Sequence, residues 1–152
     1  MPRLLTSFAA ILLLAGAATA EPIKLDLGDF KLTSAAKGGE DLVKYENDKI
    51  NFYSNGTATA KLTVPADSDY VIVVDASCDE ALKQFAKLTL KVGDMTVKEN
   101  FELSSQDQKE YKFDVKLKKG ETTLSISFTN DAYKENEYDR NLFVHGVSVD
   151  KK

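Results

Sequence analysis

The chain has 152 residues, 29% of them charged, and a formal net charge of −4 at pH 7. This acidic balance argues against a nucleic-acid-binding protein, which would carry a clustered basic surface, and no polybasic cluster is present to attract anionic lipid. Cys78 is the only cysteine, so no intramolecular disulfide can form. It either pairs between chains or is a small buried side chain, and the second alternative is favoured by its residue type.

The first twenty residues predict a cleaved signal peptide. Arg3 precedes an apolar run that reaches Leu14, and Ala18-Thr19-Ala20 supplies the small-x-small pattern of a signal-peptidase site. The apolar run is shorter than the roughly 20 residues that a bilayer span needs, so we expect no membrane insertion of the mature chain. We expect a secreted or periplasmic protein whose mature part, residues 21–152, has the usual size of one domain.

Apolar residues in the mature part recur mostly at every second position, which is typical of half-buried β-strands. Residues 70–74 (YVIVV) instead form a continuous apolar run, as expected for a strand buried on both faces. Turn-forming pairs separate the runs, among them Asn55-Gly56, Gly93-Asp94 and Lys119-Gly120. In chain order, the predicted strands are 23–27, 50–53, 61–64, 70–74, 86–92, 95–103, 111–117, 123–128 and 142–149.

About nine or ten short strands at this spacing predict an all-β fold, a jelly-roll type β-sandwich of two antiparallel sheets. Residues 77–85 are the one segment that could form a helical turn or two, and they could equally form a long loop. No linker or internal repeat divides residues 21–152, so a single domain is expected. His145 is in phase with Val147 and Val149, which favours a packed, hydrogen-bonded histidine.

The segment 128–144 (FTNDAYKENEYDRNLFV) contains four acids that do not alternate with apolar residues: Asp131, Glu135, Glu137 and Asp139. A loop of this length can bring two or more carboxylates together, and calcium binds about six to eight oxygen ligands in irregular geometry. An EF-hand is excluded because the glycine and the final glutamate of its loop are missing. Zinc is disfavoured because the chain has one histidine and one cysteine, far apart. The aspartates could instead cap turns, and the glutamates could be solvated loop acids.

Arg140 is the only arginine of the mature chain, although lysine is abundant. A planar guanidinium can bind a carboxylate or carbonyl groups through two N–H groups at once, which an ammonium group cannot do. We therefore expect Arg140 to hold the acidic loop in shape rather than to contact a ligand. Asn130 and Asn141 lie at the two ends of this loop and are expected to hydrogen-bond its backbone.

The string Phe128-Thr129-Asn130-Asp131, then Asp139-Arg140-Asn141-Leu142 and a strand ending in Val147-Ser148-Val149, is similar to a known signature. It resembles the C-terminal part of the calcium-dependent xylan-binding modules, carbohydrate-binding module families 36 and 60. Residues 69–73, 88–93 and 111–120 resemble strands and turns of the same modules, so the resemblance spans most of the mature chain. It implies an exported β-sandwich that binds a polysaccharide through a loop-held Ca2+, whose shell is completed by sugar hydroxyls.

The resemblance implies that Asp131, Asp139 and the backbone carbonyl of Tyr138 bind Ca2+. The insert between the two aspartates is longer than in the compact xylan binders, and His145 stands where such modules often carry an acid. The chain has no tryptophan, so Tyr133 and Tyr138 are the loop aromatics expected to face a sugar ring.

We expect no enzymatic activity. No serine elbow, cysteine–histidine pair or phosphate loop is present, and a catalytic carboxylate pair needs a deep, desolvated cleft for which a small sandwich offers little room. The alternative to glycan binding is a structural or adhesive cell-envelope protein in which calcium only stabilises the loop. Neither hypothesis predicts an oligomeric state.

Overall fold

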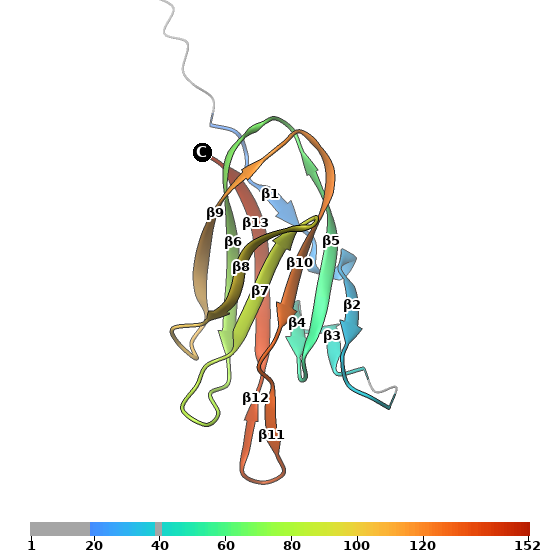
Figure 1. Cartoon of the computed structure of the whole chain (residues 1–152), viewed down its shortest axis with the longest axis vertical. Helices are drawn as coiled ribbons and strands as arrows, with labels where there is room; N and C mark the ends of the chain where they lie inside the picture. The colour runs from blue at the N-terminus through green and yellow to red at the C-terminus, as the bar shows by residue number, and fades with distance from the viewer. Residues whose placement is uncertain (1–18, 39–40) are drawn as a thin grey trace, which may run out of the picture.

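The computed structural model describes residues 19–38 and 41–152, which form two antiparallel sheets stacked as a sandwich (Figure 1). The first sheet has the order β3 (Val43–Glu46), β4 (Lys49–Phe52), β13 (Leu142–Lys151), β6 (Ser68–Cys78) and β9 (Lys109–Leu117), and β1 (Ile23–Leu25) also pairs with β13. The second has the order β2 (Lys31–Ser34), β5 (Gly56–Val64), β10 (Gly120–Phe128), β7 (Lys87–Val92) and β8 (Met95–Glu102). The predicted all-β sandwich is therefore confirmed.

The core lies between the two sheets. Rings from the two sheets meet edge to face, with Phe52 of β4 and Phe128 of β10 at a centroid distance of 6.4 Å. At the other side of the sandwich, Phe101 of β8 contacts Phe113 of β9 at 5.1 Å. Cys78 is a free, buried thiol of this core, as its residue type predicts, and burial raises its pKa. Each fully buried large apolar side chain stabilises the fold by about 1.5–3 kcal/mol.

Each predicted strand overlaps a strand of the structure, but four short strands were not predicted. These are β2, β3 and the two strands of a hairpin, β11 (Ala132–Lys134) and β12 (Tyr138–Arg140). Residues 77–85 form no helix, because β6 continues to Cys78 and the following loop turns at Leu82 and Lys83, which have positive φ. In the described part of the chain, the one helical segment is a single 3-10 turn, Leu27–Asp29.

His145 lies at a β-bulge, where the pairing register of β13 with β6 shifts between Val144 and Gly146. Val144 is buried before the bulge and Val147 is buried after it, so the alternation changes phase and His145 is on the outer face. The prediction that His145 shares a strand face with Val147 and Val149 is therefore wrong. The hydrogen bond is present, since its Nε2 lies 2.7 Å from Oγ of Ser77, and partial burial lowers the pKa of the imidazole.

Gly56 begins β5 where three strands come close together. A Cβ atom at this position would lie 2.4 Å from the carbonyl oxygen of Thr33 on β2 and 2.5 Å from Cγ2 of Val43 on β3. Only glycine therefore lets the two strands close on β5. This contact brings the β2–β3 connection beside the β4–β5 turn at one end of the sandwich.

The predicted signal peptide, residues 1–20, falls almost entirely on residues 1–18, which lie outside the described residues. Within residues 19–38 and 41–152, no helix is long and apolar enough to cross a membrane.

Candidate functional site

The β11–β12 hairpin projects from one end of the sandwich (Figure 1). An open pocket of about 540 Å³ lies at the base of this hairpin. Three segments that are far apart in the sequence form it: the β2–β3 connection, the β4–β5 turn and the hairpin. The pocket is lined by Ala35, Ala36, Leu42, Tyr53, Ser54, Asn55, Asp131, Tyr133 and Asp139.

The structure brings Asp131 and Asp139 into this one pocket. Tyr133 pairs directly opposite Asp139 in the hairpin ladder, so their side chains project from the same face and both reach the pocket. Oδ1 of Asp131 is buried and has no hydrogen-bond partner among the described residues. Burial, followed by the negative charge of Asp139, raises the pKa of the Asp131 carboxyl above its ordinary value.

The donor set of this pocket fits a hard cation. A buried carboxylate oxygen without a partner is costly, and a second carboxylate beside it increases the cost, unless a cation lies between them. Calcium binds such carboxylates together with carbonyl and hydroxyl oxygens. Across residues 19–38 and 41–152, no group of three or more His, Cys, Asp or Glu side chains is placed to hold a metal ion. Ligands beyond the two carboxylates would therefore come from backbone, amide or ligand oxygens.

The other acids of the loop lie away from this pocket. Glu135 and Glu137 are exposed at the hairpin tip, where Asn136 turns the chain with a φ of 60°. Glu137 forms an ion pair of 2.6 Å with Lys134 across the turn. Tyr138 pairs opposite Lys134, on the hairpin face opposite to that of Tyr133, and its side chain does not line the pocket.

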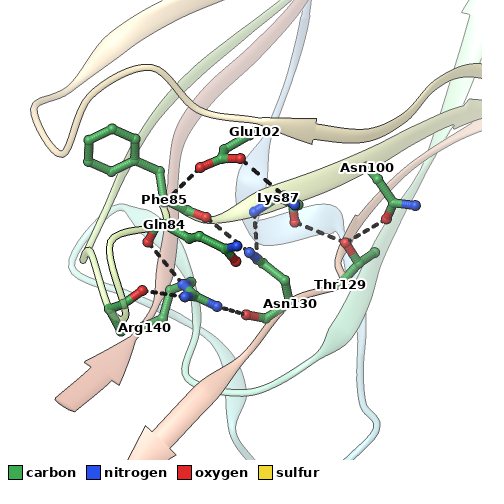
Figure 2. A network of polar contacts seen from close by, with 9 residues as sticks. Gln84, Phe85, Lys87, Asn100, Glu102, Thr129, Asn130 and Arg140 are labelled. Carbon is green, nitrogen blue, oxygen red and sulfur yellow. Dashed lines mark hydrogen bonds and ion pairs between the residues drawn. The ribbon is translucent and has the colours of Figure 1, made fainter. Parts of the chain in front are cut away.

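Arg140 is buried beneath the site, with 3% of its surface exposed. Its guanidinium donates to three backbone carbonyls: Nε to Gln84 at 3.1 Å, Nη1 to Asn130 at 2.5 Å and Nη2 to Ala81 (Figure 2). These contacts join the hairpin to the 79–86 loop. They are the kind of contact that we expected of Arg140, and they support a scaffolding role.

The two asparagines of the loop also bond to protein groups. The amide of Asn130 accepts from the backbone N–H of Lys87 at 2.7 Å and donates to the carbonyl of Phe85 at 3.0 Å (Figure 2). Asn141 donates to Oδ2 of Asp79 at 2.9 Å. Both side chains therefore tie the base of the hairpin to the β6–β7 connection.

Among the pocket residues that sequence reasoning missed, Tyr53 and Asn55 have side chains suited to bind a ligand. Tyr53 forms an aromatic wall, and its ring packs edge to face on Phe143 at 6.2 Å. The side-chain oxygen of Asn55 accepts a hydrogen bond of 2.8 Å from the backbone N–H of Asp131. The Asn55-Gly56 pair signalled only a turn, and nothing in the sequence indicated that this turn meets Asp131.

A family model gives the chain its place among known proteins. The model of CBM60, a Ca-dependent, xylan-binding carbohydrate-binding module, matches residues 71–152, more than half of the chain. The chain belongs to this family. The match begins within β6 and continues through β13, so it includes both aspartates of the pocket. A comparison with curated proteins found no match.

Solved structures share the fold of this CBM60 module. A family 36 module in complex with calcium and xylotriose has 16% identity and a TM-score of 0.60, covering 88% of this chain and 100% of that one. A family 36 domain of a multidomain xylanase from the hindgut metagenome of Trinervitermes trinervoides has 14% identity and a TM-score of 0.62, covering 87% and 97%. A family 35 module from Clostridium thermocellum has 12% identity and a TM-score of 0.57, covering 88% and 100%. The predicted resemblance to families 36 and 60 and the jelly-roll architecture are thus confirmed.

The raised pKa of Asp131 makes the stability of the metal-free module depend on pH. The folded state binds this proton more tightly than the unfolded state, so ionisation of Asp131 destabilises the fold above the raised pKa, and the penalty disappears as the pH falls through it. In EDTA, we expect Asp131→Asn to melt at a higher temperature than wild type at pH 7. The difference should shrink toward about pH 4, near the ordinary pKa of aspartate. Melting temperatures that differ equally at both pH values would contradict this account.

Proposed function

We propose that this CBM60 module acts after export as a calcium-dependent polysaccharide-binding protein, with residues 1–20 as its cleaved signal peptide. Asp131, Asp139 and the backbone carbonyl of Tyr138 would hold the ion, and a xylan-like glycan would bind over it. The observation that carries this proposal is the buried, unpartnered oxygen of Asp131 beside Asp139 in a pocket open to solvent. The similar family 36 module in complex with calcium and xylotriose supports the choice of metal and of sugar class.

Calcium would supply coordination positions for sugar hydroxyls, and the chain's own residues would orient the sugar. Tyr53 and Tyr133 line the pocket and offer apolar ring faces with a polar tip, which suits contact with a sugar ring. Tyr133 is 65% exposed, so its ring is accessible to a sugar that enters the pocket. Tyr138 would contribute only its backbone carbonyl to the ion, because its ring lies on the hairpin face opposite to Tyr133 and does not line the pocket.

Arg140 and Asn130 would keep the two aspartates in place when no ion is bound. They bond the hairpin to backbone groups of the 79–86 loop and of β7, so the carboxylates are held near each other despite their repulsion. A site that is ordered in advance binds its ligand without an additional ordering cost.

A thermal melt of residues 21–152 tests this proposal. A ligand that binds only the folded state raises the melting temperature according to its concentration and dissociation constant. We expect a rise with calcium over EDTA, and a further rise when soluble xylan is added to the calcium-loaded module. Mannans, galactans and glucans serve as comparison ligands. A response to calcium without any response to a glycan would favour a structural or adhesive envelope protein, and no response to calcium would contradict the proposal.

A further inference from the structure

Asn55 connects all three segments that form the pocket. Its side-chain oxygen accepts a hydrogen bond of 2.8 Å from the backbone N–H of Asp131, which is 76 positions away in the sequence. Its backbone carbonyl accepts a bond of 2.8 Å from the N–H of Ala35 in the β2–β3 connection. Asn55 itself belongs to the β4–β5 turn, so this one residue fixes the β4–β5 turn and the β2–β3 connection relative to the start of the hairpin.

The neighbours of Asn55 hold it in position. Ser54 is buried, and its Oγ lies 3.0 Å from Oγ of Ser34 at the end of β2. Gly56 follows directly, in the close contact with Thr33 and Val43 that admits no side chain. The side chain of Asn55 therefore approaches Asp131 from a turn whose backbone has little freedom to move.

The hydrogen bond to Asp131 also determines which way the Asn55 amide faces. Only the oxygen of an amide can accept a bond from a backbone N–H, so the oxygen must point to Asp131. The NH2 group lies at the other end of the same amide, in a side chain that lines the pocket. Among the described residues, it has no hydrogen-bond acceptor. An NH2 group cannot bind a cation, but it can donate to an oxygen of a sugar.

We infer that Asn55 is a positioning residue for Asp131 and that its NH2 group donates a hydrogen bond to the bound glycan. This inference rests on the proposed calcium-dependent function. A carboxylate in a metal site depends on the groups that fix its backbone, and the loss of such a partner typically lowers metal affinity about 10–100-fold. Asn55 thus links the affinity for the ion to the recognition of the sugar.

Two substitutions separate these roles. Asn55→Ala removes both the acceptor and the donor, whereas Asn55→Asp keeps an acceptor for the N–H of Asp131 and removes the donor. We expect Asn55→Ala to bind calcium at least about tenfold more weakly than wild type. Asn55→Asp should bind calcium at least as tightly as wild type, yet bind xylohexaose about tenfold more weakly at saturating calcium.

Isothermal titration of calcium, and then of xylohexaose, measures both affinities. Thr57→Val is the control, because Thr57 follows the same turn but bonds to Ser127 outside the pocket, and we expect it to match wild type. An unchanged calcium affinity in Asn55→Ala would overturn the positioning role. The same conclusion would follow if Asn55→Asp lost as much calcium affinity as Asn55→Ala. Unchanged xylohexaose affinity in Asn55→Asp would overturn the contact with the sugar. If wild type binds calcium, any of these results overturns only the role assigned to Asn55. If wild type binds no calcium, the proposed function is overturned as well.

Discussion

Replacing Asp131 and Asp139 together by asparagine is expected to abolish calcium binding by the module. Both carboxylates line the same pocket, and the substitution removes the two negative charges while it keeps the shape of the side chains. The loss should exceed the roughly 10–100-fold effect of removing an outer partner of a metal site, because the ligands themselves are changed. Isothermal titration with calcium measures it, and glycan binding in the presence of calcium should disappear with the ion.

The matched control is the double substitution Glu135→Gln and Glu137→Gln. It removes the same amount of charge from the same hairpin, but both glutamates lie at the exposed tip, and the ion pair of Glu137 with Lys134 is solvated. We expect near wild-type calcium affinity in this control. The assignment of the site fails if the two double variants lose calcium affinity equally, because the effect would then reflect the general charge of the loop.

Replacing Arg140 by alanine is expected to destabilise the fold by about 3 kcal/mol or more. The substitution leaves carbonyls of Ala81, Gln84 and Asn130 without their donor in a buried region, and each unsatisfied group costs about 1–3 kcal/mol. The melting temperature of the metal-free module should fall by about 10 °C. Calorimetry in EDTA measures this effect without any contribution from calcium.

Arg140→Lys and Lys118→Ala complete the comparison. An ammonium group cannot reach three carbonyls in the geometry of a guanidinium, so Arg140→Lys should recover only part of the stability. Lys118 is exposed and forms no ion pair in the described part of the chain, so its removal controls for the loss of one positive charge. The scaffolding account is wrong if Arg140→Ala melts within about 2 °C of wild type, or if Arg140→Lys restores the full stability.

The long strands could be predicted from the sequence because their burial follows the alternation of residue types. In β10, for example, Leu124, Ile126 and Phe128 are buried and the residues between them face outward. Among the strands that were missed, β3 and β11 are three or four residues long and mostly exposed, so they show no alternation to detect. β2 does alternate, but only over four residues. Their positions are set by neighbouring strands rather than by their own residues.

The parts of the site that were predicted are those that lie close together in the sequence. The acidic segment and Arg140 stood out within a few positions of each other, and the structure places both aspartates in one pocket. Tyr53 and Asn55 were missed because they meet the hairpin only through the packing of β4 and β5 against β2 and β3. The bulge at His145 was missed because one extra residue changes the phase of a strand without changing its composition.

The central claim is that calcium held by Asp131 and Asp139 is itself part of the sugar-binding site. Titration of xylohexaose into residues 21–152, with calcium, with EDTA, and after calcium is restored in excess, tests it most directly. We expect binding with calcium, no measurable heat of binding in EDTA, and full recovery when calcium returns. Binding of equal affinity in EDTA would contradict the account, because the glycan would then be held without the ion.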